Sequence, residues 1–264
     1  MSVFQELARM EKENRAGALC TIIRSQGSTP RGSGSRMLVY PDGSISGTVG
    51  GGELENRVIA QAREAIKDGK SRLLEYNMTD PARGDPGVCG GQVEVYVEPL
   101  LPKPTIVVIG AGHVGKAVAH LAHWLGYQVV VNDDRPEFCT PEFVPDADQY
   151  LPYKMAELPQ YLEITSWTYL VLTTRGSNVD VEGLPALLDT TAAYVGVIGS
   201  QRRWAVARKE MIENGVSPEK LERVRSPIGL ELNAETPEEI AVSIMAEIIM
   251  LYQGGNGRAM SEKG

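Results

Sequence analysis

The chain has 264 residues, and its hydrophobic share of 42% and charged share of 23% are those of a globular protein with one large domain or two ordinary ones. Its formal net charge of −8 argues against nucleic acid and an anionic membrane surface as the main partner. The chain opens on charged, amphipathic residues, and no apolar run approaches the length of a membrane span. We therefore expect a cytoplasmic protein without a signal peptide, a location that the odd number of cysteines without a C-x-x-C pair also favours.

The first part of the chain predicts an α+β arrangement. Its periodicities and turn signals predict, in order, a helix at 2–14, a strand at 18–23, a hairpin at 36–49, a helix at 54–68 and strands at 71–78 and 93–97. Prolines then mark a linker over residues 99–104, because proline lacks the N–H donor of regular structure and stiffens the chain. We expect an N-terminal α+β domain at residues 1–98, before this linker.

A dinucleotide-binding fingerprint opens the second part. The apolar run 106–109 predicts a buried strand, and a G-x-G-x-x-G motif follows it at 110–115. A helical pattern and a second apolar run lead to Asp133, an acid at the end of the next strand. The glycines permit a tight turn and let backbone N–H groups reach a pyrophosphate at the helix N-terminus, while Asp133 is placed to accept hydrogen bonds from a ribose. This context favours a nucleotide site over an ordinary glycine-rich turn.

Strands and helices continue to alternate to the end of the chain, which predicts a Rossmann-like, doubly wound parallel sheet over residues 105–264. Further strands are expected at 169–173 and 194–199, each followed by a helix, and a last helix starts at the capping signal of Thr236. Polar, cationic or glycine-rich clusters follow the strands, at the sheet edge where such folds bind ligands. Several clusters at one edge indicate a large anionic ligand.

Two segments and one cysteine of the N-terminal domain also suit a ligand. Residues 25–36 combine hydroxyls, glycines and arginines, and Gly50-Gly51-Gly52 precedes a helix, which makes a second anion site. The alternative for residues 25–36 is a solvated loop. Cys89 lies among glycines, where its thiol is sterically open and can ligate a soft metal or carry sulfur. The alternative for Cys89 is a small buried hydrophobe, and both interpretations stay open.

Taken together, these motifs resemble the XdhC/CoxI family, the accessory proteins of molybdenum hydroxylases such as xanthine dehydrogenase and aerobic carbon monoxide dehydrogenase. The matching segments are Gly27–Arg31, Gly47–Glu55, Cys89–Gly91, Gly110–His113, Asp133–Arg135, Ile198–Ser200 with Arg202, Pro227–Leu230 and Thr236–Ala241. Family members often carry a histidine within 173–180, and this chain has none there. The resemblance implies an XdhC/CoxI-type N-terminal domain followed by a Rossmann-like domain.

The resemblance also implies a function: binding the molybdenum cofactor, in mono- or dinucleotide form, protecting it for sulfuration and delivering it to a molybdenum hydroxylase apoenzyme. A cysteine desulfurase and a second copy of the chain, in a homodimer, are further expected partners. Motifs and resemblance together select as cofactor contacts Ser28, Thr29, Arg31, Gly51, Gly52, Glu53, Gly110, Gly112, His113, Gly115, Asp133, Arg135, Gly199, Ser200 and Arg202. Cys89 is the expected contact to molybdenum or its sulfur, and no residue is assigned a catalytic role.

Two other functions remain open. The fingerprint and Asp133 also fit an NAD(P)-dependent oxidoreductase, although no histidine follows His123 to transfer a proton. A nucleotidyltransferase or nucleotide sensor is the third hypothesis, in which Asp133 and Asp134 hold Mg²⁺. We favour a cofactor chaperone without turnover of its own.

Overall fold

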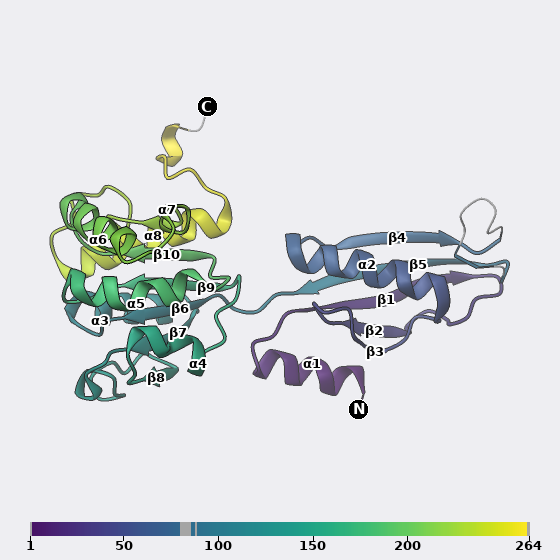
Figure 1. The fold of residues 1–264 in the computed structure, drawn as a ribbon. Helices are drawn as coiled ribbons and strands as arrows, with labels where there is room; N and C mark the ends of the chain where they lie inside the picture. The colour runs from purple at the N-terminus through teal and green to yellow at the C-terminus, as the bar shows by residue number, and fades with distance from the viewer. Residues whose placement is uncertain (1, 80–85, 88, 263–264) are drawn as a thin grey trace. The chain divides into compact units, whose positions relative to one another are not determined.

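The protein is described by a computed structural model, which covers residues 2–79, 86–87 and 89–262. The chain divides into two compact units, Met1–Pro102 and Lys103–Gly264. Figure 1 shows the elements of each unit. No helix within the described residues is long and apolar enough to cross a bilayer.

The first unit is an antiparallel sheet with two helices. Its elements are α1 (Val3–Lys12), β1 (Gly17–Gln26), β2 (Arg36–Val39), β3 (Ile45–Gly47), α2 (Gly52–Asp68), β4 (Arg72–Asn77) and β5 (Gln92–Leu100). The strand order is β3-β2-β1-β5-β4, and every neighbouring pair is antiparallel. The predicted α+β class of this part is therefore confirmed.

The helix α2 packs its apolar side on one face of this sheet (Figure 1). Val93, Val95 and Val97 are buried and alternate along β5 with more exposed residues, so the three valines lie on the face that α2 covers. The helix contributes Leu54 and Val58 to the same cluster. This alternation is what the sequence pattern of β5 predicts.

The strand β5 extends three residues beyond its predicted end at residue 97, and the last two of them lie in the predicted proline linker. Pro99 pairs with Ala18, and Leu100 pairs with Gly17. The pairing of β5 with β4 stops at Val97, so the missing N–H of Pro99 costs no ladder bond on that side. The irregular segment between the two sheets is therefore 101–104 rather than 99–104.

The second unit is a three-layer α/β structure. Its elements are β6 (Thr105–Ile109), α3 (His113–Trp124), β7 (Gln128–Asn132), η2 (Pro136–Phe138), β8 (Gln149–Leu151), η3 (Met155–Glu157), α4 (Leu158–Tyr161), β9 (Thr168–Leu172), α5 (Ser177–Leu188), β10 (Tyr194–Val197), α6 (Gln201–Glu213), α7 (Pro218–Leu221), β11 (Val224–Arg225), α8 (Pro237–Gln253) and η4 (Met260–Glu262). All strands are parallel, in the order β11-β10-β9-β6-β7-β8. This is the doubly wound order of a Rossmann fold, as predicted.

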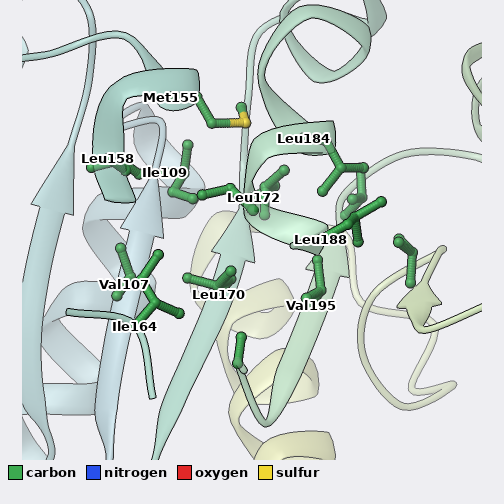
Figure 2. Packing of buried hydrophobic residues seen from close by; sticks show 14 of the residues in the cluster. Val107, Ile109, Met155, Leu158, Ile164, Leu170, Leu172, Leu184, Leu188 and Val195 are labelled. Carbon is green, nitrogen blue, oxygen red and sulfur yellow. The ribbon is translucent and has the colours of Figure 1, made fainter. Parts of the chain in front are cut away.

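Two hydrophobic clusters hold the helices to the two faces of the parallel sheet. On one face, Leu170 and Leu172 of β9 pack with Leu184 and Leu188 of α5 and with Met155 (Figure 2). On the other face, α3 and α8 pack against the same strands. From β6 the chain adds β7 and β8 on one side of the sheet and then crosses over to add β9, β10 and β11 on the other side. The boundary between β6 and β9 is therefore the topological switch point, where such folds have a ligand-binding crevice.

Candidate functional site

A cavity of about 730 Å³ lies at the carboxyl edge of the parallel sheet, at the switch point between β6 and β9. The loops after β6, β7 and β9 and the start of α5 contribute its wall, as expected for this fold. Its lining consists of Ile109, Gly110, Gly112, His113, Lys116, Asn132, Asp133, Asp134, Arg135, Phe138, Phe143, Lys154, Met155, Ala156, Thr173, Thr174, Arg175, Asn178, Val179, Glu182 and Gly183. It therefore combines apolar and aromatic surface with cationic side chains.

The glycines of the fingerprint have different tasks. A Cβ on Gly115 would lie 2.0 Å from the carbonyl oxygen of Gly110, so this glycine lets α3 approach the loop. Gly110 has φ +101, and a Cβ there would lie 2.7 Å from the oxygen of Thr173. A Cβ on Gly112 would meet no atom within 4 Å. Gly112 therefore leaves open space in front of the N-terminus of α3, whose first turn has no side-chain cap and can donate its N–H groups to an anion.

Asp133 organises the loop after β7 and is buried, with 3% of its surface exposed. Its carboxylate accepts hydrogen bonds from the amide of Ala111 at 2.9 Å and from Nε and Nη2 of Arg135 at 2.9 and 2.8 Å. Burial alone would raise the pKa of Asp133, but these hydrogen bonds outweigh burial and hold the pKa below 3.8. Asp133 thus ties the glycine loop to Arg135.

The neighbouring carboxylate bridges two loops at the same edge. Asp134 accepts two hydrogen bonds from the guanidinium of Arg175, at 2.6 and 2.9 Å. These bonds lower the pKa of Asp134. The guanidinium of Arg135 lies over the ring of Phe138, 3.8 Å from its centroid. Both carboxylates proposed for Mg²⁺ are therefore engaged by guanidinium groups.

The predicted residues after β10 do not reach this cavity. Gly199, Ser200 and Arg202, all in the described part of the chain, lie outside its lining. Ser200 instead caps α6, accepting a hydrogen bond from the amide of Arg203 at 3.2 Å, and Arg202 is exposed. The next arginine, Arg203, instead reaches Asp180 of α5 and Thr174 in the loop after β9.

Sequence reasoning missed a buried network beside the cavity. Arg203 donates to Asp180 at 2.8 Å and to Thr174 at 3.1 Å, and the hydroxyl of Thr174 donates to Asp180 at 2.5 Å. Burial raises the pKa of Asp180, against the lowering effect of these partners. Thr174 lines the cavity, so the network fixes its wall. Asp180 is an acid on the buried, otherwise apolar face of α5, a position that helical periodicity could have revealed.

The N-terminal motifs converge in the first unit. A Cβ built on Gly91 would lie 2.3 Å from the backbone oxygen of Ser28 and 2.7 Å from Cγ2 of Thr29. A Cβ on Gly50 would lie 3.0 Å from Pro30. The three predicted segments, 25–36, 50–52 and 89–91, are therefore neighbours at one end of the antiparallel sheet.

Within this group, Glu55 rather than Glu53 organises the glycine segment. Glu55 accepts hydrogen bonds from the hydroxyl of Thr48 at 2.5 Å and from the amides of Val49 and Gly51 at 3.2 and 3.3 Å. Glu53 pairs with Arg57 at 2.9 Å on the exposed side of α2. The other predicted contacts here, Ser28, Arg31 and Gly52, are exposed, and Thr29 is half-buried.

The three cysteines differ in exposure. Cys89 is exposed, while Cys20 and Cys139 are buried. Burial raises the pKa of Cys20 to about 12, as expected for a core thiol. Within the described residues, no group of three or more histidine, cysteine or acidic side chains has the geometry to hold a metal ion. Cys89 is thus the accessible thiol of the described part of the chain.

These features define a Rossmann domain joined to an α+β unit with a cysteine and glycine-rich loops. The chain belongs to the XdhC family: residues 106–248 match the XdhC Rossmann domain, and residues 10–77 match the XdhC and CoxI family.

Two curated proteins are similar to the chain at more than 30% identity. The chain is 35% identical to the Escherichia coli (strain K12) protein named "Uncharacterized protein YqeB", over 98% of this chain and 48% of that protein. It is 32% identical to a probable xanthine dehydrogenase subunit of Bacillus subtilis (strain 168), over 59% of this chain and 45% of that protein. The chain thus spans about half the length of these two relatives.

Two more distant proteins match over most of their length. "Molybdenum cofactor insertion chaperone PaoD" of Escherichia coli (strain K12) is 21% identical, over 90% of this chain and 85% of that protein. A crystal structure described as a xanthine dehydrogenase from Bacillus halodurans superposes with a TM-score of 0.51 and 23% identity. The match covers 100% of this chain and 98% of that chain. This last likeness supports the fold.

Proposed function

We propose that the chain is an accessory protein that binds the molybdenum cofactor and supports its sulfuration and insertion into a molybdenum hydroxylase of the xanthine dehydrogenase or carbon monoxide dehydrogenase type. Membership of the XdhC family supports this role, as does the name of the chaperone relative. The observation that carries the proposal is the convergence of segments 25–36, 50–52 and 89–91 beside one exposed cysteine. In this proposal the protein acts by binding and transfer, without turnover.

The residues present in the first unit fit such a cofactor. A Cβ built on Gly51, Gly52 or Gly90 would meet no atom within 4 Å, so the backbone at all three glycines is open to a ligand. The N-terminus of α2 has no side-chain cap, and its N–H groups suit oxo or phosphate oxygens. When bound, the cofactor supplies a dithiolene-held metal, and the exposed thiol of Cys89 suits a contact to that metal or its terminal sulfur.

We propose that the Rossmann unit, taken by itself, binds a phosphate-bearing ligand. Its glycine loop and cationic cavity suit the phosphate of a mononucleotide form, the tail of a dinucleotide form, or a separate NAD(P) molecule. His113 lines this cavity at the first turn of α3, consistent with a contact to phosphate.

Partners belong to the same proposal. Sulfuration needs a sulfur donor, and a cysteine desulfurase is the class of enzyme that supplies one. The apo-hydroxylase is the acceptor of the finished cofactor. We include a homodimer of this chain, which light scattering of the purified protein would test directly.

The test is a cofactor census of protein purified without oxygen from molybdenum-replete cells. Denatured samples are oxidised and assayed for fluorescent pterin, molybdenum and nucleotides. We expect pterin and molybdenum in equal amounts with the wild type and their loss with Cys89→Ala, while the unfolding curve stays unchanged. NAD(P) without pterin, and no pterin uptake from added cofactor, would overturn the molybdenum role and leave an oxidoreductase or nucleotide sensor.

A further inference from the structure

Asp133, the residue that the fingerprint assigns to the ribose, has no free hydrogen-bond acceptor site in this structure. An ionised carboxylate offers about four lone-pair sites. In Asp133, one oxygen accepts from the backbone N and Nε of Arg135, at 3.1 and 2.9 Å, and the other accepts from Ala111 N and Arg135 Nη2, at 2.9 and 2.8 Å. All four sites are used. A ribose diol therefore finds no free acceptor on Asp133, the residue that the fingerprint assigns to it.

The same edge is rich in donors. A guanidinium carries about five N–H groups. Arg135 uses two of them on Asp133, and Arg175 uses two on Asp134. Each guanidinium therefore keeps donors that can turn to a further anion. A phosphate needs only donors, whereas a diol also needs an acceptor.

The charged side chains that line the cavity also favour an anion. Among the described residues that line it, the cations Lys116, Arg135, Lys154 and Arg175 outnumber the carboxylates Asp133, Asp134 and Glu182. This balance contrasts with the net charge of −8 of the whole chain. Arg135 and Arg175 pair with Asp133 and Asp134, and Lys154 lies 3.5 Å from Glu182. The cavity lining therefore has a formal excess of one positive charge on an otherwise acidic protein.

An aromatic platform completes the edge. Arg135 stacks on Phe138 at 3.8 Å, and Lys116 lies 5.3 Å from the ring centroid of Phe143. Both rings line the cavity. A guanidinium that lies over an aromatic ring is fixed in place and suits contact with both a nucleobase and a phosphate.

We propose that the Rossmann cavity selects a nucleotide that carries a second phosphate on the 2′-oxygen of its ribose, the NADP(H) class, over the same nucleotide with a free diol. The glycine loop takes the 5′-phosphate, and Arg135 and Arg175 take the 2′-phosphate. This inference rests on the part of the proposed function that gives the cavity a nucleotide. The inference specifies the class of nucleotide, and it assigns the preference for the 2′-phosphate to Arg135 and Arg175.

The experiment is calorimetric titration of the full chain with two pairs of probes that differ only in the 2′-phosphate. The pairs are adenosine 2′,5′-bisphosphate with 5′-AMP, and NADP⁺ with NAD⁺. We expect the 2′-phosphorylated member of each pair to bind about tenfold more tightly or better, the effect of one charge-assisted contact. Equal binding, or tighter binding of the free diols, would overturn the inference.

A double variant, Asp134→Asn with Arg175→Gln, removes the pair without leaving an unmatched charge. It should abolish most of the 2′-phosphate preference, read as the ratio of the two affinities within each pair of probes. Lys209→Gln is the matched control, because Lys209 pairs with Glu213 on the exposed surface of α6. If the double variant does not fold, Arg175→Lys keeps the charge but loses the bidentate geometry, and the preference should fall with it.

The outcomes separate this inference from the proposed function. Binding of 2′-phosphorylated and free nucleotides with equal strength overturns the inference alone. Binding of no nucleotide overturns the inference and the nucleotide role together. A preference that survives in the folded double variant overturns the assignment to the arginines. A cofactor census without pterin, beside a clear 2′-phosphate preference, overturns only the molybdenum role.

Discussion

The guanidinium of Arg203, on the first turn of α6, donates a 2.8 Å hydrogen bond to the carboxylate of Asp180, which is buried in α5. The bond joins α5 and α6, two of the helices that pack on one face of the parallel sheet. Through Thr174 it also reaches the loop after β9, in the wall of the cavity. The Arg203–Asp180 pair therefore links the helical layer to the wall of the candidate site.

Removing one member of this pair should be costly. Asp180→Ala leaves the guanidinium of Arg203 without its buried partner, and we expect a loss of about 3–5 kcal/mol in the free energy of unfolding. Urea denaturation followed by circular dichroism measures it. The control is Asp189→Ala, whose exposed partner is Lys220, with an expected loss below about 1 kcal/mol. Equal losses in the two variants would contradict the structural role of Asp180.

The second prediction concerns acid stability and Asp133. Its folded-state pKa is held below 3.8, so the stabilisation is fully present above the ordinary value and is lost as pH falls through the lowered pKa. We expect the unfolding free energy of the wild type to fall steeply below pH about 4, and that of Asp133→Asn to fall less steeply. Denaturation series at several pH values give both slopes. Parallel slopes would show that Asp133 titrates as an unfolded carboxyl does.

Sequence periodicity predicted most of the second unit because its strands are long apolar runs buried on both faces. Such runs need no tertiary information, and the capping box at Thr236 fixed the start of α8 equally well. The short strand β8 was missed. It has three residues, lies at the sheet edge and contains Gln149, so neither length nor composition distinguishes it from a loop.

The candidate site was predictable in its location but less so in its contacts. The fingerprint located the cavity, since strand ends of one parallel sheet must meet at one edge. It did not show that Asp133 is saturated by Arg135, because hydrogen-bond partners depend on side-chain rotamers. Arg202 was selected from the family resemblance, whereas Arg203 makes the contacts to Thr174 and Asp180. Adjacent helical residues point about 100° apart, and the sequence alone does not say which of the two is turned inward.

The third prediction compares two glycines of the same loop. Gly115→Ala places a Cβ 2.0 Å from the oxygen of Gly110, and we expect a loss of about 3 kcal/mol in unfolding free energy as α3 is pushed away. Gly112→Ala meets no atom within 4 Å and should leave stability within about 1 kcal/mol of the wild type. Its methyl group nevertheless occupies the approach of a phosphate, so 5′-AMP should bind roughly tenfold more weakly.

Denaturation and calorimetry of the two alanine variants separate packing from access. The expected pattern is a destabilised Gly115→Ala and a stable Gly112→Ala with weakened nucleotide binding. A stable Gly112→Ala with unchanged affinity for 5′-AMP would mean that the phosphate does not approach the glycine loop.

The last prediction concerns thiol chemistry. Cys89 is exposed, while burial raises the pKa of Cys20 to about 12 and also raises the pKa of Cys139, whose Sγ donates to the oxygen of Val131 at 3.3 Å. Because the thiolate is the reactive form, native protein at pH 8 should show one fast thiol per chain with a chromogenic disulfide reagent. Unfolded protein should show all three cysteines of the sequence.

The variant Cys89→Ser assigns the fast thiol. It should abolish the fast phase and leave the two slow thiols, which react only as the chain unfolds. Cys20→Ala serves as the control, since it removes a buried thiol and should leave the fast phase intact. A fast phase that persists in Cys89→Ser would show that one of the core cysteines becomes accessible. Cys89 would then lose the accessibility on which its proposed contact to metal or sulfur depends.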